Sequence, residues 1–233
     1  MNIIILSVHD ATFQPIANLT VPHMIEYCQR YDYKLKIDNC VDAVDTSSKQ
    51  PFQHIINHRK LMLIKNHILS QKYDWVFWLD TDALIMNMTI KLEYFIDNNY
   101  DLIIGEDWNG INAGVFFIKS CQASVDFIDS CIQYKPTQFD KERTPYWWWP
   151  SEQCAITRCI NMKRTRIVHH SLFNGYIIEP NSTNMWPQYD IGPFDKNFKP
   201  KVFTHGDFII HFVSYDIPYK VAQISHYIKK IIR

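Results

Sequence analysis

Residues 75–85 read W-V-F-W-L-D-T-D-A-L-I, an apolar run that leads into two carboxylates, Asp80 and Asp82. Five large apolar residues before Asp80 predict a strand that is buried on both faces, as at the centre of a parallel sheet. Open α/β sheets bind their ligands beyond the carboxyl ends of such strands. Because side chains at i and i+2 point to the same side, both acids can turn toward one hard cation. The stretch therefore predicts an α/β fold with a cation site at this edge.

Aspartate is also favoured in turns, so Asp80 and Asp82 have an alternative interpretation as ordinary turn formers at a strand end. A second apolar trio, residues 83–85, follows them directly. An unpaired carboxylate in apolar surroundings is costly, and a bound metal is a natural partner for it. This context favours the metal interpretation.

Length and charge limit the class of protein. The 233 residues are enough for one domain with a full core, so we expect a single domain over residues 1–233. The 24 basic and 24 acidic residues balance, which argues against a nucleic-acid partner or a polybasic membrane patch.

Residues 1–8 are apolar but too short for a signal peptide or a membrane span, and they predict the first strand. The six cysteines show no C-x-x-C spacing, which predicts reduced thiols.

The hydrophobic pattern alternates between strand and helix periods, as in βαβ proteins. Predicted strands cover residues 2–8, 34–38, 75–79, 102–106, 114–118, 166–169 and 208–212. Predicted helices cover residues 22–30, 57–71, 92–97, 121–134 (with Ser120 as N-cap), 152–160 and 219–231. The expected architecture is a mostly parallel central sheet flanked by helices.

Two proline-rich segments interrupt this pattern, residues 135–150 and 180–201. The first contains Trp147, Trp148 and Trp149, which form either aromatic core, the favoured interpretation, or an exposed surface that stacks on an acceptor sugar. The second contains Trp186, another stacking candidate, in a long irregular loop of a kind that is usually functional.

Six segments in order along nearly the whole chain carry recognisable motifs: residues 27–33, 75–85, 107–119, 151–153, 173–176 and 206–212. Together they resemble the galactosyl/xylosyl/mannosyl-transferases of glycosyltransferase family 34. Residues 75–85 are similar to the family's W-(I/V)-x-W-x-D-(S/T)-D-A block, and residues 206–212 to its G-D-(F/L)-x-x-H-F. The chain departs from the family pattern at Asp32 and Ser214, where Gly is common, and at Lys119, where Arg is usual.

This resemblance implies a GT-A-type, Rossmann-like fold and a retaining transfer from a nucleotide-sugar with the help of a divalent metal. It places His211 as the third protein ligand beside Asp80 and Asp82. Two carboxylates and one imidazole suit Mn²⁺, with Mg²⁺ as the alternative. Considered without the resemblance, a His inside an apolar strand is more often a hydrogen-bonded core residue.

The resemblance also implies which residues act on the donor. Gln153 and Glu152 would lie beside the anomeric carbon, where Gln153 stabilises an oxocarbenium-like centre and Glu152 orients donor or acceptor; the alternative is a solvated helix start. The expected donor-binding residues are Asp80, Asp107, Asn112, Ala113, Gly114, Gly206 and Lys220. Lys60 and Lys119 are further candidates for the diphosphate, ranked after Lys220. Residues 1–82 would form the nucleotide-binding half and residues 83–233 the half that binds donor sugar and acceptor.

The expected function is a metal-dependent retaining glycosyltransferase that moves a hexosyl or pentosyl unit, preferably from a UDP-sugar, to an oligosaccharide or glycoconjugate through an α linkage. Two alternatives stay open. A haloacid-dehalogenase-type phosphatase also has a strand-end D-x-D, but on its first strand and with Thr or Val where Leu84 stands. A carbohydrate-binding domain without catalysis would suit the 15% aromatic content. A soluble cytoplasmic protein of bacterial or viral origin is expected, with the Golgi lumen as the alternative for an excised catalytic domain; the sequence carries no prediction of oligomeric state.

Overall fold

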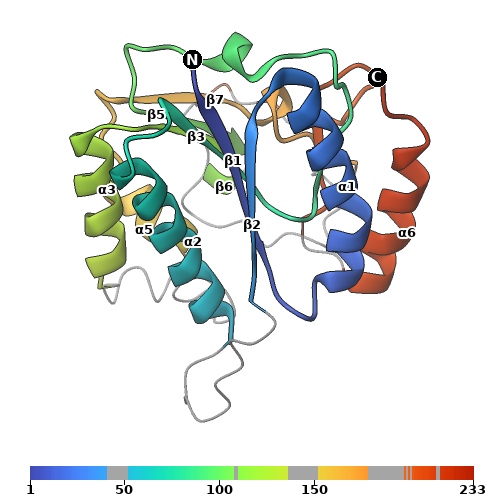
Figure 1. Ribbon diagram of the computed structural model, residues 1–233, viewed down its shortest axis with the longest axis horizontal. Helices are drawn as coiled ribbons and strands as arrows, with labels where there is room; N and C mark the ends of the chain where they lie inside the picture. Colours follow the sequence, from blue (N-terminus) through green and yellow to red (C-terminus); the bar gives the residue numbers. More distant parts are fainter. Residues whose placement is uncertain are drawn as a thin grey trace.

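The structure is a computed structural model, and it describes residues 1–40, 52–107, 110–135, 152–177, 197, 199, 201–213 and 216–233, with the backbone alone for residues 52–58. Figure 1 shows helices on both sides of a twisted central sheet. The predictions for the Trp147–Trp149 triplet, for Trp186 and for Ser214 lie outside the described residues. Within the described part of the chain, no helix is both long enough and apolar enough to cross a bilayer.

The central sheet has six strands. Their spatial order is β2 (Lys34–Asn39), β1 (Ile3–His9), β3 (Trp75–Leu79), β6 (Gly110–Lys119), β5 (Leu102–Asp107) and β7 (Thr165–His169). The pairs β1–β2, β1–β3 and β5–β7 are parallel, whereas β6 runs antiparallel to both of its neighbours. The predicted α/β class with a mostly parallel sheet is confirmed, with β6 as the one reversed strand among those described.

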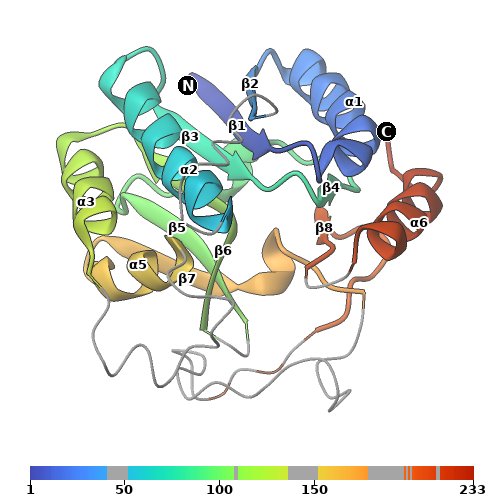
Figure 2. The same cartoon turned by 90° about the horizontal axis from the view of Figure 1, so that it is seen from below.

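Each face of the sheet is covered by its own set of helices (Figures 1 and 2). Helices α1 (Gln14–Tyr31) and α6 (Ile217–Ile228) pack together on one side, and α2 (Phe52–Leu69), α3 (Gln122–Gln133) and α5 (Glu152–Cys159) on the other. Strand β1 explains why both faces need helices. Its residues Ile3 and Ile5 belong to the core beside α1, while Ile4 and Leu6 belong to the core beside α2. Side chains alternate across a strand, so a fully apolar strand needs cover on both faces.

A short second sheet brings distant parts of the chain together. Strand β4 (Ala83–Ile85) pairs antiparallel with β8 (Ile209–His211), and Ala83 lies opposite His211. The sequence analysis treats residues 83–85 only as an apolar trio, because three residues carry no measurable period. This pairing places His211 next to Asp82.

Several predicted boundaries are wrong for local reasons. Helix α1 begins at Gln14, not near residue 22, because Pro15 suits the first turn and Pro22 is accommodated inside the helix. The N-cap of α3 is Cys121 rather than Ser120. Helix α6 begins at Ile217, where Asp216 caps it by accepting from the backbone N–H of Tyr219 at 2.9 Å. The expected helix over residues 92–97 is a 3₁₀ turn, η1 (Leu92–Phe95), and a second one, η3 (His170–Leu172), follows β7.

Candidate active site

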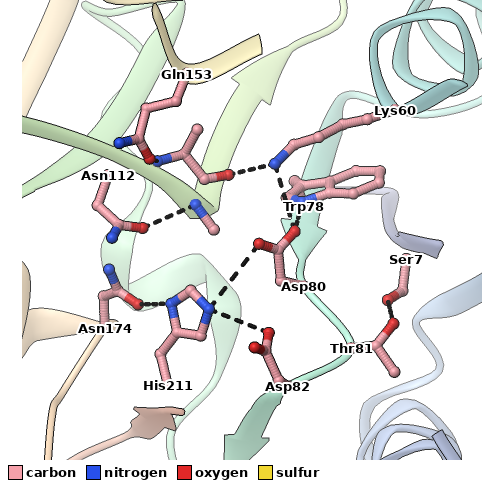
Figure 3. Close-up of polar contacts among 12 residues, drawn as sticks. Ser7, Lys60, Trp78, Asp80, Thr81, Asp82, Asn112, Gln153, Asn174 and His211 are labelled. Carbon is pink, nitrogen blue, oxygen red and sulfur yellow. Dashed lines mark hydrogen bonds and ion pairs between the residues drawn. The ribbon is translucent and has the colours of Figure 1, made fainter. Parts of the chain in front are cut away.

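The D-T-D stretch leaves β3 with its residues pointing in two directions (Figure 3). Thr81 faces β1, where its hydroxyl donates to the carbonyl of Val8 at 2.8 Å and lies 3.1 Å from the hydroxyl of Ser7. Asp80 and Asp82 face the other way, toward His211. Thr81 therefore anchors the turn to the sheet while its two neighbours share one site.

Asp80, Asp82 and His211 form a cluster suited to a cation. Each offers one ligand atom, and these atoms all lie within 4.8 Å of one another. Nε2 of His211 lies 3.2 Å from Oδ1 of Asp82 and 3.9 Å from Oδ2 of Asp80. The structure thus brings together the three residues that the sequence analysis assigned to a metal.

Lys220 reaches the same cluster from α6. Its Nζ lies 2.5 Å from Oδ2 of Asp82, and both side chains are buried. Burial alone would raise the pKa of Asp82, but the Lys220 ammonium and the His211 ring hold that pKa well below its usual range. Asp82 is therefore a carboxylate with a positive group already beside it.

Asp80 lies nearer to solvent. Its side chain is 34% exposed against 9% for Asp82. The indole N–H of Trp78 donates to Oδ1 of Asp80 at 2.6 Å, which fixes one oxygen and leaves the other toward His211. Burial raises the pKa of Asp80, against the opposing effect of Lys60. Since its remaining surface is open, Asp80 is the acid that an incoming ligand meets first.

Lys60 is buried beside Asp80 rather than exposed. Its Nζ donates to the carbonyl of Ala113 at 2.6 Å and to Oε1 of Glu152 at 3.1 Å, and it lies 3.4 Å from Oδ1 of Asp80. The ammonium also lies 4.7 Å from the centroid of the Trp78 ring. Lys60 thereby ties α2 to β6, α5 and the end of β3.

Of the two predicted catalytic residues, Gln153 bonds directly to the backbone of β6 and Glu152 bonds to Lys60. Oε1 of Gln153 accepts from the backbone N–H of Ala113 at 2.9 Å (Figure 3). Oε1 of Glu152 accepts from Nζ of Lys60. Gln153 is neither buried nor fully exposed. An amide oxygen has two lone pairs, so this bond leaves Gln153 with acceptor capacity.

Gly114 is needed because the ring of His211 packs against its backbone. A Cβ at this position would lie 2.1 Å from Cε1 and 2.8 Å from Nδ1 of His211. The predicted neighbour of Gly114 is a sugar or phosphate; the group that lies against it in the structure is the His211 side chain.

Asp107 and Asn112 belong to a buried network behind the cluster. The Nδ2 group of Asn112 donates to Oδ2 of Asp107 at 3.2 Å and to the hydroxyl of Tyr176 at 2.9 Å. Its Oδ1 accepts from the backbone N–H of Gly114 at 2.8 Å. Burial, and then the charge of Asp107, raise the pKa of Tyr176 well above its usual value.

Two predicted donor contacts lie elsewhere. The carbonyl of Gly206 accepts from the side chain of Asn87. Both residues lie beyond the Ile85–Ile209 end of the β4–β8 pair, away from His211. Lys119 pairs with the start of β3, at Trp75, and donates to the carbonyl of Asn98. Their roles with the donor stay predictions, without support from the position of either residue.

Asn174 has no predicted role from the sequence, although the structure places it against His211. The segment around Gly175 pairs with Ile210 of β8, which brings the amide oxygen of Asn174 within 2.7 Å of Nδ1 of His211. The only signal in the sequence was a polar residue inside the motif of residues 173–176.

Comparisons with known proteins identify glycosyltransferases as similar to this chain. A family model described as the galactosyl transferase GMA12/MNN10 family matches residues 94–216, and a second one, a protein of unknown function named DUF273, matches residues 25–143. Galactomannan galactosyltransferase 1 of Cyamopsis tetragonoloba is 27% identical over 128 residues, which are 51% of this chain and 28% of that protein. Probable xyloglucan 6-xylosyltransferase 3 of Arabidopsis thaliana is 30% identical over 87 residues, 33% of this chain and 19% of that protein. The chain thus matches less than a third of the length of these relatives.

Solved structures share the fold. A glycosyltransferase involved in the glycosylation of the major capsid of PBCV-1 superposes with a TM-score of 0.65 at 16% identity, covering 97% of this chain and 100% of that one. The galactosyltransferase LgtC, in complex with donor and acceptor sugar analogs, gives a TM-score of 0.56 at 10% identity, covering 99% and 96%. At these identities the likeness shows the GT-A fold alone.

Proposed function

The chain belongs to the galactosyl transferase GMA12/MNN10 family, glycosyltransferase family 34, and we propose that it transfers a hexosyl or pentosyl unit from a nucleotide-diphosphate sugar to a glycan. A UDP-sugar is the favoured donor, and an oligosaccharide or glycoconjugate is the acceptor. The transfer retains the configuration of the donor sugar and forms an α linkage. In this proposal residues 1–82 bind the nucleotide, and residues 83–233 bind the donor sugar and the acceptor, within one catalytic domain.

The observation that carries the proposal is the cluster of Asp80, Asp82 and His211 at the carboxyl end of β3. The donor set fits a divalent cation, because two carboxylates and one imidazole nitrogen lie within 4.8 Å of one another and two of the three side chains are buried. The ammonium of Lys220 keeps Asp82 in its ionised form, which is the form that binds a cation. Mn²⁺ is the favoured ion and Mg²⁺ the alternative.

When bound, the metal would neutralise negative charge that builds on the diphosphate as the glycosidic bond breaks. The chain's own residues supply the rest of the site. Asp82 is the more direct ligand, while the more exposed Asp80 is shared between the metal and the ribose. Lys220 lies beside Asp82 and can donate to a phosphate oxygen once a ligand arrives, which adds a second positive charge at the leaving group.

Gln153 and Glu152 are proposed to act on the sugar. Gln153 is held by its bond to the backbone of Ala113, so its amide is fixed in position before the donor binds. The remaining lone pair of its oxygen would stabilise positive charge at the anomeric carbon. Glu152 is positioned by Lys60 and would orient the sugar or the acceptor. Asp107, Asn112, Ala113 and Gly114 would form the wall of the donor site.

Family membership favours transfer over the two alternatives that the sequence left open. A haloacid-dehalogenase-type phosphatase would release phosphate from a generic phosphomonoester without any nucleotide-sugar. A binding domain without catalysis would bind glycan in the absence of both metal and nucleotide. Neither activity requires a histidine in the position of His211, beside both Asp80 and Asp82.

The test is a thermal-shift screen of nucleotide-sugars with and without Mn²⁺, followed by an assay of hydrolysis and transfer with the donor that stabilises the protein most. A ligand that binds the native state alone raises the apparent stability. Asp82→Asn should abolish the Mn²⁺-dependent shift and both activities. Asp126→Asn changes an exposed aspartate on α3 and should leave them unchanged. An unaltered rate in Asp82→Asn would contradict the metal assignment, and an inverted anomeric product in the NMR spectrum would contradict retention.

A further inference from the structure

A chain of five buried polar side chains leads from the donor wall to the cation cluster. Its members, in order, are Asp107, Tyr176, Asn174, His211 and Asp82, and each is less than 9% exposed. They come from β5, from residues 174–176, from β8 and from the turn after β3. Figure 3 shows the end of this chain, where Asn174 faces one nitrogen of the His211 ring and Asp82 the other.

The first links fix the orientation of the Asn174 amide. The hydroxyl of Tyr176 lies 2.9 Å from Oδ2 of Asp107, and since a carboxylate only accepts, the hydroxyl donates to it. With its proton used in this way, the Tyr176 oxygen accepts from Nδ2 of Asn174 at 2.9 Å. A second amide, Nδ2 of Asn112, donates to the same oxygen at 2.9 Å. The Asn174 amide must therefore turn its oxygen toward His211.

The last links fix the proton on His211. Oδ1 of Asn174 lies 2.7 Å from Nδ1 of His211, and because an amide oxygen has no proton to give, Nδ1 must donate. The other ring nitrogen, Nε2, then faces Oδ1 of Asp82 and Oδ2 of Asp80, at 3.2 and 3.9 Å. These oxygens only accept, so without a metal the hydrogen bond to Asp82 uses a proton on Nε2, and a bound cation would take the place of that proton. The ring also packs directly on Gly114, which restricts its rotation.

We propose that Asn174 is a positioning residue, oriented by Tyr176 and Asp107, that keeps Nδ1 of His211 protonated so that Nε2 presents its lone pair to a cation held by Asp80 and Asp82. The proposal rests on the metal part of the proposed function. It assigns Tyr176 and Asp107 a second task, because the same hydrogen bonds that build the donor wall determine which nitrogen of His211 can bind metal. A partner on the non-ligating nitrogen fixes the tautomer and the orientation of a histidine ligand.

The first measurement needs no metal, and its result comes from protein in which all five side chains are intact. Protein with ¹⁵N-labelled histidine is examined by NMR in mildly alkaline buffer without metal, and the His211 signals are assigned by their loss in His211→Asn. The proposal expects a proton on Nδ1 of His211. A His211 ring that carries its proton on Nε2 alone, with Nδ1 unprotonated, would overturn it.

The second measurement is a titration with Mn²⁺ alone, in which EPR reports the free ion. Asn174→Leu keeps the volume but removes the acceptor, and Mn²⁺ affinity should fall by about 10- to 100-fold, as is typical when a partner of a metal ligand is lost. Tyr176→Phe leaves Asn174 in place but removes the group that orients it, and the loss should be smaller, below about tenfold.

The matched control is Tyr27→Phe. It makes the same chemical change at a buried tyrosine whose hydroxyl donates to the carbonyl of Ile90 at 2.6 Å, on the α1 side of the molecule. It should lower stability and leave Mn²⁺ affinity unchanged. If Tyr27→Phe weakens Mn²⁺ binding as much as Tyr176→Phe does, or if Asn174→Leu binds Mn²⁺ like the unaltered protein, the proposal is wrong.

These tests separate the inference from its premise. An unaltered protein that binds no Mn²⁺ would contradict the metal part of the proposed function, and the position of the proton on His211 would still decide the direction of the hydrogen bonds. If Asn174→Leu does not fold, Tyr176→Phe and the NMR measurement still decide whether the chain of five side chains positions the proton on His211.

Discussion

Nζ of Lys220 lies 2.5 Å from Oδ2 of Asp82, and both groups are buried. The chain thus supplies a positive charge of its own to the carboxylate that is proposed to bind the metal. An ammonium and a divalent ion at one carboxylate repel each other, whereas a diphosphate attracts both. The pair therefore links the affinity for metal to the presence of the nucleotide.

Lys220→Met tests this link. Loss of one partner from a buried ion pair typically destabilises a protein by about 3 kcal/mol or more, so the metal-free variant should unfold at lower temperature. Without the ammonium, Mn²⁺ alone should bind more tightly than to the unaltered protein, while a nucleoside diphosphate should bind more weakly. Calorimetry with each ligand measures both effects. Lys229→Met alters an exposed lysine at the end of the same helix and should change neither; weaker Mn²⁺ binding in Lys220→Met would contradict the proposed competition.

Gly114→Ala should disturb His211 directly. The added Cβ would lie 2.1 Å from Cε1 of that ring, so either the ring or β6 must move. We expect lower stability together with a loss of Mn²⁺ affinity, measured by urea unfolding and by EPR titration. Gly105→Ala is the control, because its Cβ would meet its nearest neighbour at 3.6 Å, an ordinary contact. Equal losses in the two variants would mean that the packing of His211 on Gly114 has no specific effect on the metal.

Lys60 and Glu152 should be energetically coupled. Lys60→Met leaves a partly buried Glu152 without its cation and should cost about 3 kcal/mol of unfolding free energy. In the double variant with Glu152→Gln, the loss should be smaller than the sum of the two single losses by about 1–3 kcal/mol. Urea unfolding of the four proteins gives this coupling energy.

The control cycle uses Lys65 and Asp129, an ion pair at 2.5 Å whose side chains are 24% and 35% exposed. Because water screens such a pair, its coupling should stay below about 1 kcal/mol. Additive effects at Lys60 and Glu152 would show that the buried contact does not stabilise the end of β6.

His170 should make the folded state sensitive to acid. Burial lowers its pKa to about 4; of the charged groups nearby, Lys201 lowers that pKa and Asp207 raises it. The neutral ring donates from Nδ1 to the carbonyl of Asn174 and accepts at Nε2 from the backbone N–H of Lys201, so a second proton would break the latter bond. The unfolded chain, with a pKa near 6.5, takes up a proton that the folded protein excludes.

Stability should therefore be unaffected by this group above pH 6.5 and should fall as the pH drops from 6.5 to 4, by about 3 kcal/mol in total. Urea unfolding across this range measures the slope. In His170→Gln the slope should be shallower, whereas in His205→Gln, which alters an exposed histidine, it should match that of the unaltered protein. Identical slopes in all three proteins would contradict the role of His170.

The parts of the fold that the sequence predicted are those determined by local patterns. Five apolar residues before Asp80 are enough to identify a central strand, and strand β3 has the predicted bounds. Strand β4 escaped prediction because its three residues become a strand only by pairing with β8. The early start of α1 is not predicted, because a proline such as Pro22 usually marks a helix boundary. Tertiary contacts hold the helix together around Pro22, for example the hydrogen bond from the Thr20 hydroxyl to the carbonyl of Thr81.

The same distinction applies to the site. The spacing of Asp80 and Asp82 at a strand end predicts them as ligands, the family resemblance adds His211, and the structure brings the three together. The partners of these ligands were not predicted. Asn174 lies 37 residues before His211, and the sequence holds no local sign that the two would meet. Lys60 is a predicted candidate for the diphosphate, although most lysines lie at the surface, and its burial follows from the packing of α2, α5 and β6 around it.

The pairing of β4 with β8 also determines when the site can exist. The bonds from Asp82 to His211 and to Lys220 join residues 129 and 138 positions apart. Contacts of such high sequence separation close large loops of chain, which has an entropic cost. Without β8 and α6 in place, both acids lie at the end of β3 without these two partners. If the proposed cation needs all three side chains, its binding requires that both ends of the chain are folded together, and a chain that stops short of residue 209 would have the sheet order of β1, β2 and β3 but no third ligand.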